Sequence, residues 1–394
     1  MRASALQAVA CSIEAISQAP TRPMNKPLIH LVAAARPNFM KVAPLYHALK
    51  NEAWCETRIV HTGQHYDAEM SDAILQDLGL PDPHIHLGIG SGSHAEQTAG
   101  VMIAYEKVCL KDSPDWTVVV GDVNSTLVCT LAAKKLDIPV AHLEAGLRSG
   151  DRTMPEEINR IVTDALADVL WTPSSDANEN LIREGVAKEK IQHVGNIMID
   201  SYELLREKIE TDRTWAKFDL KVGSYAVGTL HRPSNVDSEK ALSMVVNALV
   251  QSSKRLKMIV PVHPRTKERL NQFGLMQNMD AASNIHLTRP LSYLPFMGLV
   301  HRANLVITDS GGIQEETTYL NIPCLTLRST TERPITITQG TNRLVKSEDL
   351  DQEVKRVLRE EWQQGIKPEL WDGYTAGRVV VSLKERFEGS KLQL

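Results

Sequence analysis

Short apolar runs alternate with helix-like segments along most of the chain, beginning at Leu28. The runs are almost continuously apolar, and each is followed by a stretch with apolar residues at helical spacing. Examples from the first half are LIHLVAA, TVVVGD and PVAHLEAG, and examples from the second half are YAVGTLH, KMIVPVH and NLVITDS. This alternation predicts parallel sheets built from β-α-β units, with helices covering both faces of each sheet.

A polar, charged stretch at 203–223 interrupts this rhythm before it restarts. With 394 residues, the chain also exceeds the size at which a single hydrophobic core usually stops growing. The predicted fold class is therefore α/β, with two successive Rossmann-like halves facing across a cleft and a linker near 200–222. The predicted domains are 24–202 and 203–375. Residues 1–23 are predicted to be a flexible extension or a start assigned too early. A secretory signal is the lesser alternative, because their apolar stretch is short and Glu14 and Gln18 interrupt it.

Composition narrows the class of protein. The 44 basic and 48 acidic residues nearly balance, which does not suggest a nucleic-acid partner. No apolar run is long enough to cross a bilayer, so no membrane association is expected. The five cysteines form no CxxC pair, which suits a reducing compartment and argues against structural zinc. We therefore expect a cytoplasmic protein.

Charged and hydrogen-bonding residues follow nearly every predicted strand. A single His or Asp at such a turn is usually a cap or a solvated side chain. Here seven turns in succession carry them: AARPNFMK, HTGQH, VVVGDVNST, AHLEAGLRS, TLHRPSN, PVHPRT and ITDSGGIQEE. Because the carboxyl ends of parallel strands meet at one edge of a sheet, the pattern predicts a ligand site there.

The segment ITDSGGIQEE predicts an anion site. A helix that begins at Gly311 and Gly312 presents unpaired N–H groups at the positive end of its dipole, and Ser310 adds a hydroxyl. A tight turn capped by Ser310 is the simpler alternative. Glu316, one turn further on, is placed to hold ribose hydroxyls. Countercharge for phosphates is available from other turns, on Arg36, Lys41, His263 and Arg333.

The segment MPEEINR predicts a helix that begins at Pro155. Glu156 and Arg160 are spaced as an i,i+4 pair on one face of it. Spacing alone leaves two accounts open: a surface salt bridge, or a carboxylate that points into the cleft with Arg160 orienting it. Histidines 61 and 65 do not share a face on a strand end, so no metal site is predicted.

Taken together, these motifs resemble the non-hydrolysing UDP-N-acetylglucosamine 2-epimerases, which have the GT-B architecture. The resemblance runs from about Leu28 to the C-terminus. It rests on ARPNFMKVAPL, TGQHYD, GDVNST, HLEAGLRSGDRTMPEEINR, LHRPSN, VHPRT, TDSGGIQEE and TTERPITITQGTNRLV. It implies inversion at C2 of UDP-GlcNAc to give UDP-ManNAc, with 2-acetamidoglucal and UDP as the trapped intermediate. It also implies no metal and no redox cofactor, a homodimer formed through the first half, and a C-terminal helix (about 376–394) that packs back onto the first domain.

The resemblance also implies roles for particular residues. Asp122, Glu144 and Glu156 match the acid/base carboxylates of the family, and His231 matches its essential histidine. Ser310, Gly311 and Gly312 match the pyrophosphate turn, Phe296 a uracil contact and Glu316 the ribose ligand. The remaining matches to substrate-binding positions are Arg36, Lys41, Gln64, His65, Arg160, His263 and Arg333. Arg148 is expected to be structural.

Departures from the family pattern keep alternatives open. Asn38 and Phe39 replace residues of a common TRPEAIK motif and are expected to alter the wall near the phosphates, and HRPSN replaces HRREN at a second, regulatory substrate site. Activation by substrate and the decoration of the sugar are therefore open. The alternatives are a hydrolysing epimerase, a GT-B glycosyltransferase, an epimerase of a UDP-diacetamido sugar and a non-catalytic nucleotide-sugar sensor.

Overall fold

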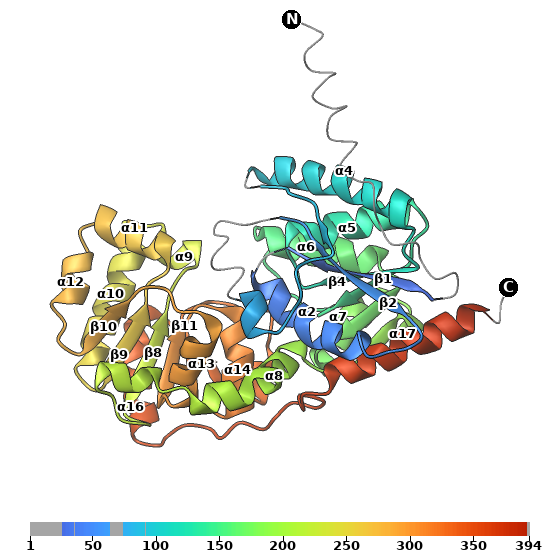
Figure 1. Cartoon of the computed structure of the whole chain (residues 1–394). Coiled ribbons are helices and arrows are strands. Elements are labelled where there is room, and N and C mark those ends of the chain that lie inside the picture. Colours follow the sequence, from blue (N-terminus) through green and yellow to red (C-terminus); the bar gives the residue numbers. More distant parts are fainter. Residues whose placement is uncertain (1–25, 35, 64–73, 91, 392–394) are drawn as a thin grey trace, which may run out of the picture.

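The computed structural model describes residues 26–34, 36–63, 74–90 and 92–391. It contains two parallel sheets, of seven and six strands, one after the other along the chain, which confirms the predicted α/β fold class (Figure 1). The strand orders are β3-β2-β1-β4-β5-β6-β7 and β10-β9-β8-β11-β12-β13. In each sheet the order reverses beside the first strand, β1 or β8, and doubly wound sheets bind ligands at this point.

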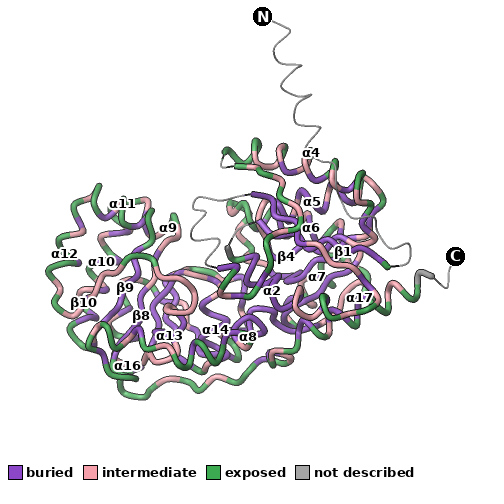
Figure 2. The backbone as a smooth tube through the Cα atoms, in the orientation of Figure 1, coloured by how far each residue is buried: buried purple, intermediate pink, exposed green. Residues whose placement is uncertain are grey.

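The apolar runs of the first half form the strands of the first sheet, and its central strands β1, β4, β5 and β6 are almost entirely buried (Figure 2). The strands are β1 (Leu28–Ala33), β2 (Glu56–His61), β3 (Ile85–His86), β4 (Trp116–Val120), β5 (Val140–Leu143), β6 (Val169–Thr172) and β7 (Ile191–His193). The helices are α2 (Arg36–Leu49), α4 (His94–Asp112), α5 (Asn124–Lys135), α6 (Pro155–Leu166), α7 (Ser175–Arg183) and α8 (Ile197–Thr211).

The second half repeats this plan with shorter helices. Its strands are β8 (Tyr225–Thr229), β9 (Lys257–Pro261), β10 (Ile285–Thr288), β11 (Leu305–Thr308), β12 (Cys324–Thr326) and β13 (Asn342–Leu344). Its helices are α9 (Pro233–Val236), α10 (Glu239–Ser253), α11 (Pro264–Gln272), α12 (Met276–Asp280), α13 (Tyr293–His301), α14 (Gly311–Leu320), α15 (Ile335–Thr338) and α16 (Leu350–Leu358).

Helix α8 joins the two halves into one packed unit. It contacts α2 of the first half and both α13 and α14 of the second (Figure 1). A single hydrophobic cluster includes Leu31 of β1, Ile199 and Leu205 of α8, and Val306 of β11. The prediction of a linker near 200–222 is thus partly wrong, because the first part of that polar stretch belongs to α8. Charged residues on the outer face of α8 hide the periodicity of its buried face.

The C-terminal segment returns from the second sheet to the first. After α16 the chain runs along the molecule to α17 (Thr375–Lys391), which packs against α2 and α8 (Figure 1). The indole nitrogen of Trp171 in β6 donates to Ser382 of α17 at 3.0 Å. Within the described ranges, no helix combines the length and apolar character needed to cross a membrane.

Candidate functional site

Two neighbouring strands of the first sheet end in acidic residues. The register of β4 and β5 pairs Val120 with Leu143, so Asp122 and Glu144 follow adjacent strand ends. Gly121 takes a φ of 67°, and a side chain there would lie 2.8 Å from Nζ of Lys41. A glycine is therefore required at this turn, because it allows the backbone to bend close to the charged groups.

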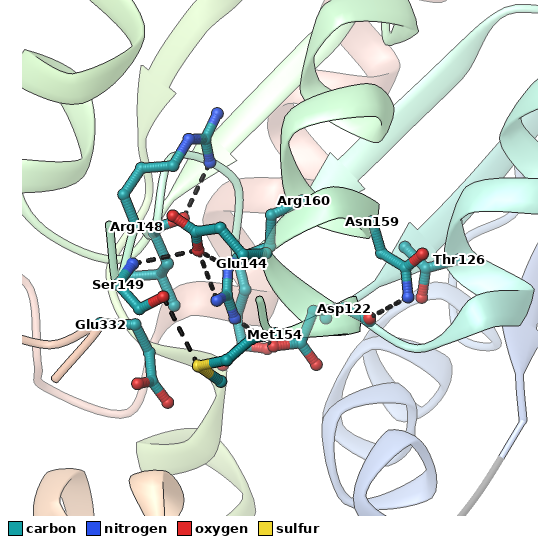
Figure 3. Close-up of polar contacts among 12 residues, drawn as sticks. Asp122, Thr126, Glu144, Arg148, Ser149, Met154, Asn159, Arg160 and Glu332 are labelled. Carbon is teal, nitrogen blue, oxygen red and sulfur yellow. Dashed lines mark hydrogen bonds and ion pairs between the residues drawn. The ribbon is translucent and has the colours of Figure 1, made fainter. Parts of the chain in front are cut away.

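Arg160 of α6 holds the Asp122 carboxylate in place (Figure 3). One terminal nitrogen of its guanidinium lies 2.6 Å from Oδ2 of Asp122, and the other lies 2.6 Å from Oε2 of Glu157. The side chain of Arg160 is 2% exposed, whereas that of Asp122 is 32% exposed. Asn159 supports the same turn by donating to the carbonyl oxygen of Asp122 at 2.9 Å. Arg160 and Asn159 thus fix the position of Asp122, while part of its carboxylate stays exposed to solvent.

The predicted Glu156–Arg160 pair is wrong. Arg160 pairs with Glu157, three residues before it, and Glu157 also accepts from the backbone amides of Ser149 and Gly150 at 3.0 and 2.9 Å. Glu156 lies exposed in the first turn of α6. Both i,i+3 and i,i+4 spacings place residues on one helix face, so the sequence did not distinguish the two carboxylates. The acid/base role of Glu156 stays a prediction.

Glu144 lies in a left-handed backbone conformation with a φ of 72°. A residue with a Cβ rarely adopts this conformation unless its surroundings hold it there. Its carboxylate is 3% exposed and forms an ion pair with Lys41 of α2. Its second oxygen lies 3.7 Å from the guanidinium of Arg333, which belongs to the second half of the chain. The two halves therefore bring opposite charges together at Glu144.

The second sheet also ends its central strands in polar residues. Register pairs Thr229 of β8 with Thr308 of β11, so His231 and Asp309 follow adjacent ends. Nδ1 of His231 lies 2.9 Å from the buried Asp309 carboxylate, while the His231 side chain is 41% exposed. Burial raises the pKa of Asp309, but the hydrogen bond and charge of His231 more than offset this and leave it below its usual value. Asp309 orients the ring, a role that the sequence interpretation missed.

The start of α14 has the features of an anion site. Ser310 is its N-cap and makes no side-chain capping bond. A side chain at Gly311 would lie 2.6 Å from the guanidinium of Arg333, so the helix start and this arginine are in close proximity. Arg333 also pairs with Glu315 at 2.9 Å and with Glu332 at 2.6 Å. Arg333 is thus held beside the helix start by two carboxylates.

Glu316 is buried further along α14 and accepts a hydrogen bond from the hydroxyl of Tyr293 at 2.7 Å. Burial raises the pKa of Glu316 to about 7, although the bond from Tyr293 lowers it in part. Tyr293 begins α13, which also carries the half-buried Phe296. Tyr293 was missed because a tyrosine at a helix start has no distinctive spacing. The structure places Glu316 and Phe296 on neighbouring helices.

The other predicted residues have different outcomes. His263 is exposed at the start of α11, with its ring centroid 5.9 Å from that of His231. Gln64 and His65 lie outside the described residues, as does the side chain of Arg36. Phe39 is fully buried in the core, so the expectation that it forms a wall near the phosphates is wrong. Among the residues that the structure describes, no three His, Cys, Asp or Glu side chains converge on a position suited to a metal ion.

Two doubly wound sheets with acidic strand ends in one half and a glycine-rich helix start in the other define a two-domain α/β protein of the GT-B class. A family model described as UDP-N-acetylglucosamine 2-epimerase matches residues 47–384. The chain belongs to this family, which confirms the resemblance seen in its motifs.

Individual relatives agree with this assignment. The UDP-N-acetylglucosamine 2-epimerase of Methanocaldococcus jannaschii is 42% identical over 324 residues, which cover 80% of this chain and 88% of that protein. The crystal structure of the M. jannaschii enzyme in complex with UDP-GlcNAc and UDP has a TM-score of 0.83, 39% identity and coverage of 91% of this chain and 99% of that chain. A UDP-2,3-diacetamido-2,3-dideoxy-D-glucuronate 2-epimerase of Pseudomonas aeruginosa is 38% identical over 317 residues, covering 80% of this chain and 87% of that protein.

Proposed function

We propose that this protein interconverts UDP-GlcNAc and UDP-ManNAc by inverting C2 of the sugar. The observation that carries the proposal is the arrangement around Glu144. Its buried carboxylate lies beside Asp122 on adjacent strand ends and within 3.7 Å of Arg333, which neighbours the start of α14. The candidate acid/base groups and the candidate diphosphate site thus come from opposite halves of one chain. The chain also belongs to a family of such epimerases.

The proposed reaction is an elimination followed by a re-addition. A carboxylate removes the C2 proton, the C1–O bond to UDP breaks with its electron pair leaving on UDP, and 2-acetamidoglucal remains. UDP then adds back to C1 while a proton is delivered to the opposite face of C2. Asp122, Glu144 and Glu156 are the candidate acid/base groups, because proton transfer on both faces needs more than one such group. The reaction as a whole neither oxidises nor reduces the sugar, so it requires no redox cofactor.

The departing UDP carries negative charge that the second half can stabilise. The N–H groups at the start of α14, with Arg333 beside them, suit the diphosphate. His231 is oriented by Asp309 and partly exposed, so its outer nitrogen is free to serve the diphosphate or the sugar. Glu316 is proposed to hold the ribose hydroxyls and Phe296 to contact the uracil.

A homodimer is also proposed. Helices α4, α5 and α6 contact one another in sequence, and at least half of each of three apolar side chains on α4 and α6 is exposed: Ile103, Leu110 and Ile158. Apolar surface of this kind suits burial against a second copy. Sedimentation velocity is expected to give twice the chain mass, and Leu110→Glu is expected to give monomer. A wild-type protein that sediments as a monomer at micromolar concentration contradicts this proposal.

A cytoplasmic location is proposed as well. The four cysteines within the described ranges, Cys55, Cys109, Cys129 and Cys324, are buried and unpaired. Free thiols suit a reducing compartment.

One experiment tests the activity and separates the alternatives. The protein is incubated with UDP-GlcNAc in deuterated water, and the C2 proton is followed by NMR. Deuterium at C2 with UDP-ManNAc accumulating is the expected result, whereas free ManNAc indicates a hydrolysing epimerase. Sugar transferred to an added acceptor without C2 exchange indicates a glycosyltransferase. Exchange seen only with a UDP-diacetamido uronate favours the substrate of the P. aeruginosa relative. No exchange with either sugar contradicts the proposed function and leaves the sensor.

A further inference from the structure

A buried chain of charged side chains lies behind the two acidic strand ends. His142 of β5 is fully buried, with Nδ1 2.6 Å from Oδ1 of Asp164 and Nε2 2.8 Å from the carbonyl oxygen of Gly121. The second oxygen of Asp164 accepts from the amide of Gly146 at 3.0 Å and pairs with Arg148 at 2.7 Å. None of these side chains has a role in the reaction proposed above.

The partners of His142 define its charge. A carbonyl oxygen can only accept a hydrogen bond, so Nε2 must carry a proton. Nδ1 must carry one too, because Asp164 is ionised. Burial raises the pKa of Asp164, but the charges and hydrogen bonds of His142 and Arg148 more than offset this and lower it below its usual value. A neutral imidazole would turn its lone pair toward one of the two oxygens. His142 is therefore an imidazolium.

Charge around the imidazolium is balanced locally. Arg148 lies between Asp164 and Glu184, with a nitrogen 2.7 Å from a carboxylate oxygen of each. His142 and Arg148 thus face two carboxylates. This arrangement gives Arg148 the structural position expected from the sequence, and it lets a cation persist in a site with no exposure to water.

The linked side chains of His142 and Asp164 fix the backbone at both acidic turns. The carbonyl oxygen of Gly121 belongs to the peptide that joins Gly121 to Asp122, so the bond from His142 sets the plane of that peptide. On the other side, Asp164 holds the amide of Gly146, two residues after the left-handed Glu144. Gly146 itself has a φ of 81°, and a side chain there would come within 2.5 Å of the carbonyl oxygen of Ala177. Strained conformations of this kind persist only where several contacts enforce them.

We propose that His142, as an imidazolium held by Asp164, is a positioning residue that sets the orientation of Asp122 and Glu144 without touching the substrate. The proposal rests on the proposed function, because it takes these two carboxylates as acid/base groups. One side chain on β5 and one on α6 connect both acidic turns, so their loss displaces both carboxylates together. The expected effect falls on the chemical step, while UDP binding by the second half is retained.

The charge on His142 is tested in the wild-type protein. Long-range ¹H–¹⁵N NMR with ¹⁵N-histidine labelling at pH 7 reports whether each ring nitrogen carries a proton. The expected spectrum shows a proton on both ring nitrogens of His142, because each nitrogen faces an oxygen that accepts. A single neutral tautomer at pH 7 overturns the proposal. This measurement needs neither turnover nor a folded variant, so its outcome is separate from that of the proposed function.

The positioning role is tested with two variants that each keep part of the contacts. His142→Asn retains a donor near Asp164 and loses the one to Gly121, whereas His142→Gln places an amide donor toward Gly121. Both are expected to lower kcat by about 10- to 100-fold, with KM for UDP-GlcNAc and the Kd for UDP changed less than about threefold.

His30→Asn is the matched control. His30 is a fully buried histidine in the middle of β1, and it has its own aspartate partner, Asp112, at 3.5 Å. Its loss is expected to lower the melting temperature to a similar degree and to leave kcat within about twofold. If the His142 variants lose no more kcat than His30→Asn at equal loss of melting temperature, the proposal is overturned. If Asp122→Asn and Glu144→Gln retain full turnover, these carboxylates are not acid/base groups and the positioning proposal is overturned. The proposed function fails separately, if the wild-type protein shows no C2 exchange.

Discussion

Arg160 and Asp122 are joined by an ion pair of 2.6 Å, although 38 residues separate them in the chain. The arginine is almost fully buried, and the carboxylate it holds is about one-third exposed. An acid/base group needs a fixed position and access to the substrate, and this pair supplies both for Asp122. Glu144, on the neighbouring strand end, is also held by a cation, Lys41 of α2, but its side chain is only 3% exposed.

Removing the charge from either carboxylate is expected to stop the chemistry and to preserve the fold. Asp122→Asn and Glu144→Gln should each lower turnover and C2 deuterium exchange at least about 100-fold, because a lost acid/base group has effects of this size. Asp137→Asn is the control, since Asp137 is exposed at the opposite end of β5 and its left-handed conformation suits asparagine. Unchanged turnover in either variant would remove that residue from the mechanism.

Glu156 and Glu157 are expected to separate stability from activity. Glu157 is buried and paired with Arg160, so Glu157→Gln should destabilise the protein by about 3–5 kcal/mol, the usual cost of breaking a buried pair. Glu156→Gln should leave the free energy of unfolding within about 0.5 kcal/mol, because the side chain is exposed, and should reduce C2 exchange at least about 100-fold. Chemical denaturation and exchange NMR measure the two effects. A Glu156→Gln variant with normal exchange would show that Glu156 is not an acid/base group.

UDP binding is expected to weaken as the pH falls through 7. Burial raises the pKa of Glu316 to about 7, so its carboxylate gains a proton below that pH and loses its capacity to accept from two ribose hydroxyls. Calorimetric titration from pH 8 to pH 6 should show the Kd for UDP rising by up to about tenfold per pH unit below 7. Glu316→Gln is the reference, because it carries the same titration of UDP itself without that of the carboxyl.

Tyr293→Phe provides a second test of this titration. The hydroxyl of Tyr293 donates to Glu316 and lowers its pKa, so its removal should shift the onset of weak binding to higher pH. If the wild type and Glu316→Gln show the same pH dependence, Glu316 does not bind the ribose.

Asp200 is expected to destabilise the protein at neutral pH. Its Oδ1 accepts from the amide of Ala376 at the start of α17 at 2.7 Å, and burial raises its pKa to about 6. A carboxyl whose pKa is higher in the folded state favours the folded state while protonated. Stability is therefore lost as pH rises from about 4 to 6, and the loss is complete above 6.

Asp200→Asn keeps the acceptor for Ala376 and removes the charge. It should raise the free energy of unfolding at pH 7.5 by up to about 3 kcal/mol, and the gain should shrink toward pH 4. Asp200→Ala should instead lower stability at both pH values, because the amide of Ala376 loses its partner. A pH-independent effect of Asp200→Asn would show that the carboxyl does not titrate as stated.

Local patterns were sufficient for most of the strands and helices and for the residues that follow the longer strands, but they did not mark the short strands β3 and β13. The alternation of buried strands and amphipathic helices recurs along the chain, and the two glycines after Ser310 mark a helix start by their own conformational freedom. The same patterns failed for α8, because its charged outer face hides a buried one.

By itself the sequence determined the fold class, the family and the strand-end positions of Asp122, Glu144, His231 and Asp309, since these depend on local periodicity and motif order. Only the tertiary structure decided which carboxylate Arg160 binds, because both spacings on α6 are compatible with the pair and burial of α6 against β5 selects Glu157. The tertiary structure also determined the left-handed backbone at Glu144 and the contacts of His142 with Asp164 and Gly121. Those depend on contacts among strand ends and α6 that are distant along the chain, and no local pattern encodes them.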